Sequence, residues 1–283
     1  MYLSEPGGMS ICECNTEFRK KTDGTSGRYE PLVQVVSSGR IGRQQMNISA
    51  GLLNYRVLNE QIRASVEDVC ISDCFGQRFI GTGMSGKVIT IHGTPGNALG
   101  AYLNGAEIHV RGNAQDAVGD TMNSGEIVIH GNAGDALGYA MRGGSLYVRG
   151  DAGYRTGIHM KEYQEKKPVI ILGGSAGSFL GEYLAGGLII VLGLESEDVP
   201  VGNFTGTGMH GGRIFIRSKQ EPQYLPVQVS VNVALPEDMR EIEAYIRKFA
   251  EHFNVNAEEI MRDQFYVLKP NAKNPYKQLY VAN

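Results

Sequence analysis

Apolar and polar positions recur along the middle of the chain with a fixed period of 19 residues. Two of the recurring series are glycines and one is apolar, and all three run through the same segment. They comprise Gly93, Gly112, Gly131 and Gly150, then Gly100, Gly119, Gly138 and Gly157, and finally Met84, Leu103, Met122, Met141 and Met160. A constant period is the sequence signature of a solenoid, in which each repeat forms one unit that packs against its neighbours.

A short β-strand is predicted before each glycine of the first series. The positions four and two residues before the glycine are apolar, and the position directly before the glycine is a histidine or an arginine. The apolar pairs are Ile89 and Ile91, Ile108 and Val110, Ile127 and Ile129, and Leu146 and Val148. Because alternate side chains of a strand point to opposite faces, this pattern is typical of a strand with one buried face. Residue types that bond the backbone in turns or stack in ladders follow the glycines, namely Thr94, Asn113, Asn132 and Asp151.

The pattern predicts an all-β fold, a right-handed parallel β-helix built as a single-stranded solenoid. No interval between the glycines is long enough for a helix, and the asparagine-punctuated consensus of leucine-rich repeats is missing. We expect about seven coils over residues 79–220, with strands of successive coils about 4.8 Å apart. The repeat lengthens after Met160, which fits two polar loops, from Lys161 to Lys167 and from Glu195 to Asp198. The eight glycines are then corner residues, where a positive φ or a close approach of two backbones is required.

The rest of the chain divides into an N-terminal extension over residues 1–50, a helical lead-in over 51–78 and a C-terminal helical tail over 221–283. One helix is predicted over 52–63. Another begins at Pro236, because proline suits the first helical turn and the residues that follow place apolar side chains on one face. A short third helix is predicted over 256–262. These flanks would cover the ends of the solenoid.

Apolar residues also occupy strand positions that the alternation assigns to the outside of the fifth and sixth coils. They are Ile170, Leu172, Ile190 and Leu192. A strand face in contact with water carries polar residues at such positions. We therefore expect this face to be covered, either by the C-terminal helices or by a partner subunit.

Composition narrows the class of protein. The 283 residues are 42% apolar, enough for a buried core, and a formal net charge of -3 argues against a general binder of nucleic acid or anionic membranes. The chain does not start with a basic and apolar leader, and its longest apolar runs are too short to span a bilayer. We expect a cytoplasmic protein with no membrane or nucleic-acid partner, and a homo-oligomer remains open.

Two groups of residues suggest chemistry, and each also has a structural interpretation. The segment Gly81 to Gly86 matches the dinucleotide fingerprint G-x-G-x-x-G, and Gly206 to Gly211 repeats it. A strand rather than a helix follows both, so corner glycines are favoured over a nucleotide site. Asp116 and Asp135 hold the same turn position in adjacent coils. They form either a carboxylate pair, as in a self-standing β-helical carbohydrate-active protein, or two solvated turns.

The four cysteines are Cys12, Cys14, Cys70 and Cys74. Their spacings, C-x-C and C-x₃-C, are not the usual pair for zinc and do not fit an iron–sulfur cluster. Structural or free thiols are favoured over a metal site, and the role of these cysteines stays open.

The coil sequences resemble those of a known family. Gly112 to Gly119 reads GNAQDAVG, Gly131 to Gly138 reads GNAGDALG, and Gly143 and Gly144 follow shortly after. These phrases are similar to those of the GXGXG domain of the glutamate synthase large subunit. The segment Gly181 to Gly187, GEYLAGG, resembles the C-E-Y-M-T-G-G phrase of that domain, with Gly in place of Cys. The resemblance covers roughly residues 50–270 and extends to the helical tail. The same coils also occur in the β-helical subunit of formylmethanofuran dehydrogenase.

The resemblance to glutamate synthase implies a non-catalytic scaffold subunit of an oxidoreductase complex in glutamate biosynthesis and nitrogen metabolism. The implied partners are a glutaminase-type amidotransferase subunit and an FMN-dependent synthase subunit. FMN and iron–sulfur clusters are expected on those partners, and no catalytic residue, cofactor or metal is expected on this chain. The alternative implied by the same coils is the equivalent subunit of formylmethanofuran dehydrogenase or of a related oxidoreductase.

Overall fold

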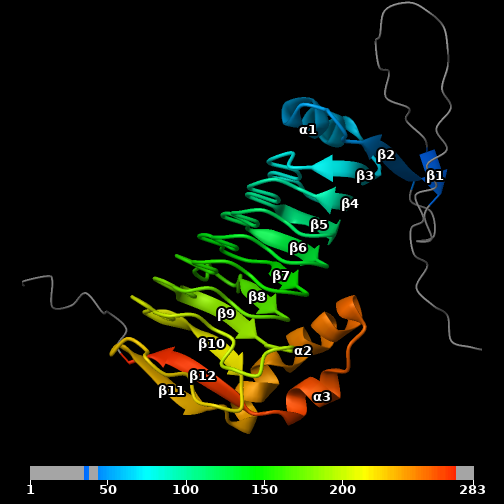
Figure 1. Ribbon diagram of the computed structural model, residues 1–283. Coiled ribbons are helices and arrows are strands. Elements are labelled where there is room, and N and C mark those ends of the chain that lie inside the picture. Colours follow the sequence, from blue (N-terminus) through cyan, green and yellow to red (C-terminus); the bar gives the residue numbers. More distant parts are fainter. Residues whose placement is uncertain (1–34, 38–43, 272–283) are drawn as a thin grey trace, which may run out of the picture.

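The structure is a computed structural model that describes residues 35–37 and 44–271. Within these residues the strands form one twelve-stranded sheet, which three helices accompany (Figure 1). The strands are β1 (Val35–Ser37), β2 (Gln44–Ser49), β3 (Asp68–Phe75), β4 (Val88–Thr94), β5 (Asn104–Arg111), β6 (Ser124–Ile129), β7 (Ser145–Val148), β8 (Val169–Leu172), β9 (Ala185–Val191), β10 (Gly211–Arg217), β11 (Val229–Val233) and β12 (Phe265–Pro270). The helices are α1 (Tyr55–Ala64), α2 (Pro236–Phe253) and α3 (Ala257–Arg262).

Strands β2 to β10 are stacked in chain order, and each pairs in parallel with the next. Parallel pairing of consecutive strands requires the chain to complete one coil before the next strand begins. Residues separated by one period pair directly, as Ile89 does with Ile108 and Ile108 with Ile127. The predicted parallel β-helix is confirmed, and Figure 1 shows it as a column of arrows from β2 to β10.

The stack begins earlier than residue 79, where the sequence analysis expects the first coil. Strand β2 pairs in parallel with β3, and β3 with β4. Helix α1 lies between β2 and β3 in the chain and covers this end of the column (Figure 1). Its N-terminus is capped by Asn54, whose side-chain oxygen accepts a hydrogen bond of 2.9 Å from the backbone N–H of Arg56. The first coil therefore contains a helix where the later coils contain only turns and short bridges.

The interior of the coils is a continuous apolar core. One row of large side chains, each 0% exposed, runs through successive coils as Leu103, Met122, Met141, Met160, Leu184 and Met209. A second row of small residues is joined by single parallel bridges and comprises Ala114, Ala133, Ala152 and Ala176. Because each coil buries its apolar side chains only against the coils above and below, stability depends on the stacking of neighbouring coils.

The two glycine series occupy corners for different physical reasons. Gly138, of the second series, has a φ of +69°, and a Cβ there would lie 2.5 Å from Cδ1 of the core residue Ile170. Gly131, of the first series, has an ordinary φ, but its Cβ would lie 2.2 Å from the side-chain oxygen of Asn113 in the preceding coil. The second series therefore needs both the left-handed conformation and an absent side chain, whereas the first series needs close approach between coils, combined with a positive φ only at Gly93.

Each second-series glycine is the middle of three alternate residues with positive φ, and Gly81, Gly181 and Gly206 hold the same place in three other coils. The first of the three is Phe79, Ala98, Ala117, Ala136, Arg155, Phe179 or Phe204 in successive coils. The last is Gly83, Tyr102, Thr121, Ala140, His159, Tyr183 or Gly208. We call these two sets the first column and the last column, and the side of the solenoid that carries them the glycine corner.

The two longer coils agree with the predicted polar loops. Residues 161–167 lie between β7 and β8, and residues 195–198 lie between β9 and β10. Both insertions keep the inward residues of the strands in register, because Leu146 pairs with Ile170 and Val191 with Ile216 across them, and the one register shift between β9 and β10 lies between Gly211 and Arg213.

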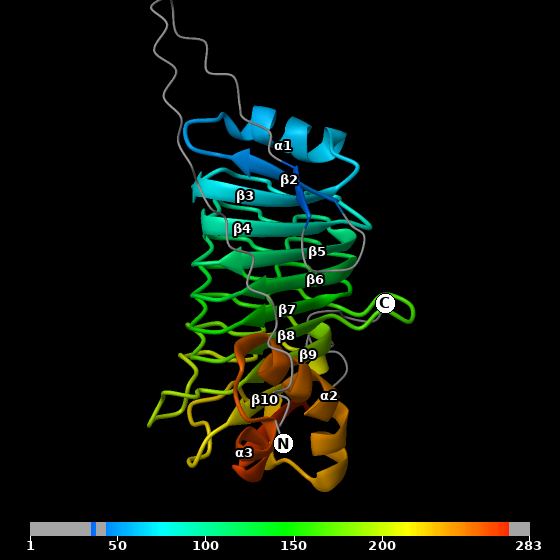
Figure 2. The ribbon, with the colours of Figure 1, turned by 90° about the vertical axis from the view of Figure 1, so that its right-hand side faces the viewer.

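The C-terminal end is closed by strands as well as by the predicted helices. Strand β12 pairs antiparallel with β10, and β11 pairs antiparallel with β12. Helices α2 and α3 lie beside the last strands of the column, on the outside of the sheet (Figure 2). Helix α2 starts at Pro236, and Asp238 accepts a hydrogen bond of 3.1 Å from the backbone N–H of Leu235. None of the helices within residues 44–271 has both the length and the apolar character needed to cross a bilayer.

Candidate docking surfaces

The outer face of the last coils is covered by the protein's own C-terminal helix. Ile190 and Leu192 are 0% exposed and belong to a second apolar cluster, separate from the coil interior. Ile242, Ile246 and Phe249 of α2 pack into the same cluster and are also fully buried. For Ile190 and Leu192, the apolar outer positions are therefore explained by α2.

Ile170 and Leu172 do not belong to that outer face. They pair with Leu146 and Val148 and lie in the cluster that fills the coil interior. The outward residues of β8 are instead Val169 and Ile171, which pack in the cluster with α2. All four residues of β8 are apolar and buried on one face or the other, so the sequence carries no alternation from which to tell inside from outside.

Ion pairs to a buried carboxylate fix the start of α2 against the solenoid. Asp238, 3% exposed, accepts hydrogen bonds from Lys269 of β12 at 2.9 Å and from Arg213 of β10 at 3.3 Å. Arg213 also donates to Glu241 at 2.7 Å. Burial acts to raise the pKa of Asp238, but the hydrogen bonds from Lys269 and Leu235 and the two cations outweigh it, and the pKa lies below its usual value. Loss of either cation would leave a buried carboxylate poorly compensated.

The end of α2 makes a second polar contact, with the outer face of β6. Glu126 lies 2.5 Å from Nζ of Lys248 and 3.0 Å from Nε2 of His252. Burial acts to raise the pKa of Glu126, but these two partners lower it below its usual value. His130, which directly follows the same strand, packs edge-on against the ring of Phe253 at 5.2 Å. Burial and the neighbouring Arg111 lower the pKa of His130 to about 4. These contacts attach the end of α2 to the middle of the solenoid.

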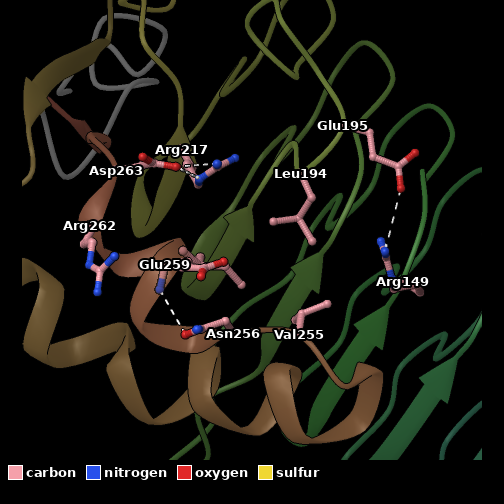
Figure 3. A pocket seen from close by; sticks show the side chains of 10 residues that line it. Arg149, Leu194, Glu195, Arg217, Val255, Asn256, Glu259, Arg262 and Asp263 are labelled. Atoms are coloured by element: carbon pink, nitrogen blue, oxygen red, sulfur yellow. Dashed lines mark hydrogen bonds and ion pairs between the residues drawn. The ribbon is translucent and has the colours of Figure 1, made fainter.

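A shallow groove of about 520 Å³ lies where α3 meets the outer side of the coils (Figure 3). Arg149 faces Glu195 across it at 3.7 Å, and Arg217 forms an ion pair with Asp263. Arg217 also donates a hydrogen bond of 2.8 Å to the carbonyl of Leu192. Because both of these arginines are engaged with acidic partners, the groove presents no clear excess of one charge to select a ligand.

The aspartates in adjacent turns have a structural role. Oδ1 of Asp116 accepts a hydrogen bond of 3.0 Å from the backbone N–H of Asp135, and Oδ1 of Asp135 accepts one of 2.8 Å from Tyr154. The residues that follow the first glycine series form a similar ladder, in which Asn113 and Asn132 each accept from the backbone of the next coil. One oxygen of each aspartate is thus used to join successive coils.

The remaining sequence candidates are located as follows. The fingerprint-like segments Gly81 to Gly86 and Gly206 to Gly211 lead into β4 and β10, not into helices, as predicted.

Cys70 and Cys74 are buried in β3, and burial raises the pKa of the Cys74 thiol to about 11, so this thiol is protonated at neutral pH. Cys12 and Cys14 lie outside the described residues. Within the described ranges no three His, Cys, Asp or Glu side chains are grouped so as to hold a metal ion.

One exposed surface, which the sequence pattern did not predict, lies on the glycine corner of the later coils. Flat side chains form two rows there, which we call the stacked edge. It consists of Tyr139, Arg155, His159, Phe179, Tyr183 and Phe204. The spacings of 24 and 25 residues from 155 to 179 and from 179 to 204 follow the lengthened period, and they are the signal from which one row could have been found.

The chain was compared with known families and proteins. A family model described as the GXGXG motif matches residues 50–272. The Methanocaldococcus jannaschii protein MJ1350 is 39% identical over 257 residues, which cover 86% of this chain and 98% of that protein. Among solved structures, a chain of the formyltransferase/hydrolase complex (FhcABCD) from Methylorubrum extorquens, determined in complex with methylofuran, matches with a TM-score of 0.55. It is 23% identical, and the match covers 69% of this chain and 70% of that chain, so it shows a shared fold.

Proposed function

Because the chain belongs to the GXGXG motif family, we propose that it is a non-catalytic scaffold subunit of a glutamate-synthase-like complex. The observation that carries the proposal is the match of the family model to residues 50–272, which includes the helical tail as well as the coils. In this proposal the chain docks a glutaminase-type amidotransferase subunit and an FMN-dependent synthase subunit. FMN and iron–sulfur clusters are held by those partners, and this chain holds neither.

The architecture supports a scaffold role in physical terms. Every coil from β2 to β10 is hydrogen-bonded to the next, and a continuous core runs along the column. Side chains on the outside are therefore held at fixed spacings, which favours binding because little conformational entropy is lost when a partner docks. Helix α2 already covers one face of the later coils, so partners are expected on the sides that it leaves open.

A second candidate is a subunit of a complex related to the formyltransferase/hydrolase complex. The observation that favours it is the shared fold with a chain of FhcABCD, at a TM-score of 0.55. Both candidates assign the same mechanical role to the coils and differ only in the enzymes that would be attached.

Co-purification tests the proposal and separates the two candidates. The chain would be tagged in its native host at its own locus, and bound proteins would be identified by mass spectrometry after washing at moderate salt. Stoichiometric recovery of a glutaminase and an FMN protein supports the first candidate. The purified assembly should then form glutamate from glutamine, 2-oxoglutarate and a reductant. Recovery of a molybdopterin protein or a formyltransferase instead would support the second candidate, and recovery of the chain alone would contradict both.

A further inference from the structure

The stacked edge is built from planar groups in contact along the solenoid axis. In one row the guanidinium of Arg155 lies 5.3 Å from the centre of the Phe179 ring, which stacks on Phe204 at 5.0 Å. In the other row the rings of His159 and Tyr183 are 5.1 Å apart and nearly parallel, with an interplanar angle of 7°. These are favourable arrangements for aromatic and cation–π pairs.

Tyr139 extends the second row, since its ring meets His159 edge-on at 6.0 Å. The row ends at Tyr183, whose ring lies over the next residue in the last column, Gly208, where a Cβ would be only 2.5 Å from the ring. The two rows thus span the coils that contain β7 to β10.

The fold does not require large side chains at these positions. Arg155, His159, Phe179, Tyr183 and Phe204 all have positive φ, from 54° to 63°. That conformation costs a residue with a Cβ about 1–2 kcal/mol relative to its ordinary states. Small residues complete the coil at equivalent places, as Ala98, Ala117 and Ala136 do in the first column and Gly83 and Gly208 in the last. An unfavourable conformation occupied by a large exposed side chain points to a use for that side chain.

The exposure of the side chains at the ends of the two rows also points to a use beyond the fold. Phe204 is 55% exposed and Tyr139 is 40% exposed, so the two rows end in rings that contact water. Stacking within the rows offsets part of the conformational cost but does not remove the outer faces from solvent. Exposed aromatic and arginine side chains on a rigid support are typical of the centre of a protein–protein interface.

Charge indicates what kind of partner fits. Asp116, Asp120 and Asp135 lie beside residues of the glycine corner, Asp135 in the coil of Tyr139 and the other two one coil earlier, whereas Arg155 forms an ion pair with Glu182, 3.1 Å away. Asp116 and Asp135 each accept a hydrogen bond from a backbone N–H of the next coil. At the equivalent position of a later coil, the hydroxyl of the uncharged Ser178 accepts the same kind of bond, of 3.1 Å, from the backbone N–H of Asn203. A negative charge is therefore not needed for that bond.

A cationic side chain is the complement of carboxylates beside aromatic faces. The contact between Arg155 and Phe179 shows that a guanidinium fits against these rings. Arg142 and Lys161 are also exposed and lie two residues beyond the last column.

We propose that the stacked edge is the docking surface for an arginine- or lysine-bearing segment of a partner subunit. The proposal rests on the proposed scaffold function for the identity of the partner, but the chemistry of the surface can be tested without it. Rings bind the alkyl stem and cationic head of the incoming side chain, and the aspartates attract it and orient it.

The test compares two triple variants with the unaltered chain. The edge variant carries Tyr139→Ala, Phe179→Ala and Phe204→Ala, and the last two introduce the residue type that the first column accepts elsewhere. The control variant carries Leu52→Ala, Phe75→Ala and Tyr224→Ala, which remove side chains that are 106%, 88% and 93% exposed outside the stacked edge. All three proteins have the same net charge, so general attraction of a cation is equal. Circular dichroism and thermal unfolding would show that the variants fold.

Binding of a fluorescently labelled hexa-arginine peptide is measured by anisotropy, with a labelled glycine–serine hexapeptide as the neutral probe. We expect the Kd of hexa-arginine to rise about tenfold in the edge variant and to stay within about twofold in the control variant. Asp135→Asn, which keeps the hydrogen-bond acceptor, should weaken binding and reduce its dependence on salt. Equal binding of hexa-arginine by the unaltered chain and the edge variant would overturn the inference.

A second arm uses the purified partner subunits identified by co-purification. Loss of assembly in the edge variant but not in the control variant supports the inference, whereas equal assembly of both variants overturns it and leaves the scaffold proposal standing. Failure of the unaltered chain to assemble contradicts the scaffold proposal, and the peptide arm still decides the chemistry of the stacked edge.

Discussion

Replacement of one inward corner glycine tests how much the free energy of unfolding depends on the geometry of the coil corner. In Gly138→Ala the new Cβ would lie 2.5 Å from Cδ1 of Ile170, and the residue would have to keep a φ of +69°. The left-handed conformation costs alanine about 1–2 kcal/mol. Insertion of a methyl group into a close-packed core costs about 1–3 kcal/mol more, because Ile170 is 0% exposed and its strand, β8, is paired with β7 on one side and β9 on the other. The expected loss of stability is therefore about 2–5 kcal/mol.

Two further variants separate the conformational from the steric contribution. Ala136→Gly, two residues earlier, removes a positive-φ alanine whose φ is 55°. The relief of that conformation is nearly offset by the entropy of glycine in the unfolded chain, so stability should change by less than about 1 kcal/mol. Ile170→Val removes the Cδ1 atom that the new methyl group would meet, at a cost of about 0.5–1.5 kcal/mol when made alone. The double variant with Gly138→Ala should then be more stable than the sum of the two single effects by about 1 kcal/mol or more.

Urea unfolding followed by circular dichroism, with tyrosine fluorescence as a second probe, gives these free energies. Coincident transitions are needed, because solenoids can unfold in segments. If Gly138→Ala lost less than about 0.5 kcal/mol, or if Ile170→Val did not rescue it, the packing argument for the second glycine series would be wrong.

Three other outcomes follow from the described contacts. His130 has a folded pKa of about 4, below the usual 6.5, so the unfolded chain binds the proton first, and stability should fall as pH falls from about 6.5 to about 4. Solvent screening limits the effect to about 1 kcal/mol, and His130→Gln should flatten the curve in urea titrations at each pH. Asp135→Ala should lose about 1 kcal/mol through its bond to Tyr154, while Asp135→Asn should keep most of it in the same assay. Phe249→Ala should lose about 3–5 kcal/mol in thermal unfolding and increase binding of an apolar dye, whereas Leu235→Ala at an exposed site should do neither.

The solenoid could be predicted because its geometry repeats in the sequence. A coil that stacks on its neighbour must place equivalent side chains above one another, so a period of 19 residues in glycines and apolar residues already implies the pairing of Ile89, Ile108 and Ile127. The same reasoning placed the two polar insertions, because loops on the outside of a solenoid can lengthen without changing the strand register. Helix α2 was predictable from Pro236 and its apolar face.

Prediction failed where the sequence does not show the alternation or the period of the repeat. Strand β8 is apolar at every position, since one face meets the core and the other meets α2, and Ile170 and Leu172 were consequently assigned to the wrong side. Strands β2 and β3 lack the corner glycines of the later coils and are separated by α1, so the first coils were not recognised. Strands β11 and β12 pair antiparallel at the end of the column and follow no repeat. Each of these elements is determined by contacts far away in the chain.

The stacked edge was harder to predict because local preference opposes it. Positive φ at a corner favours glycine, and a sequence-based argument takes large side chains beside those glycines as ordinary surface residues. Only the structure shows that Arg155 and Phe179 share one column with three alanines and have the same backbone conformation. In a repeating fold, the small residues of a column show that the backbone conformation needs no large side chain. A large side chain in the same column is a departure that indicates a role other than completing the coil. Departures also occur at Phe79 and Tyr102, but those on three later coils stack on one another at the glycine corner, and the outer sheet face of these coils is covered by α2. A chain that covers one face with its own helix and exposes stacked rings on another favours attachment of a partner at that corner.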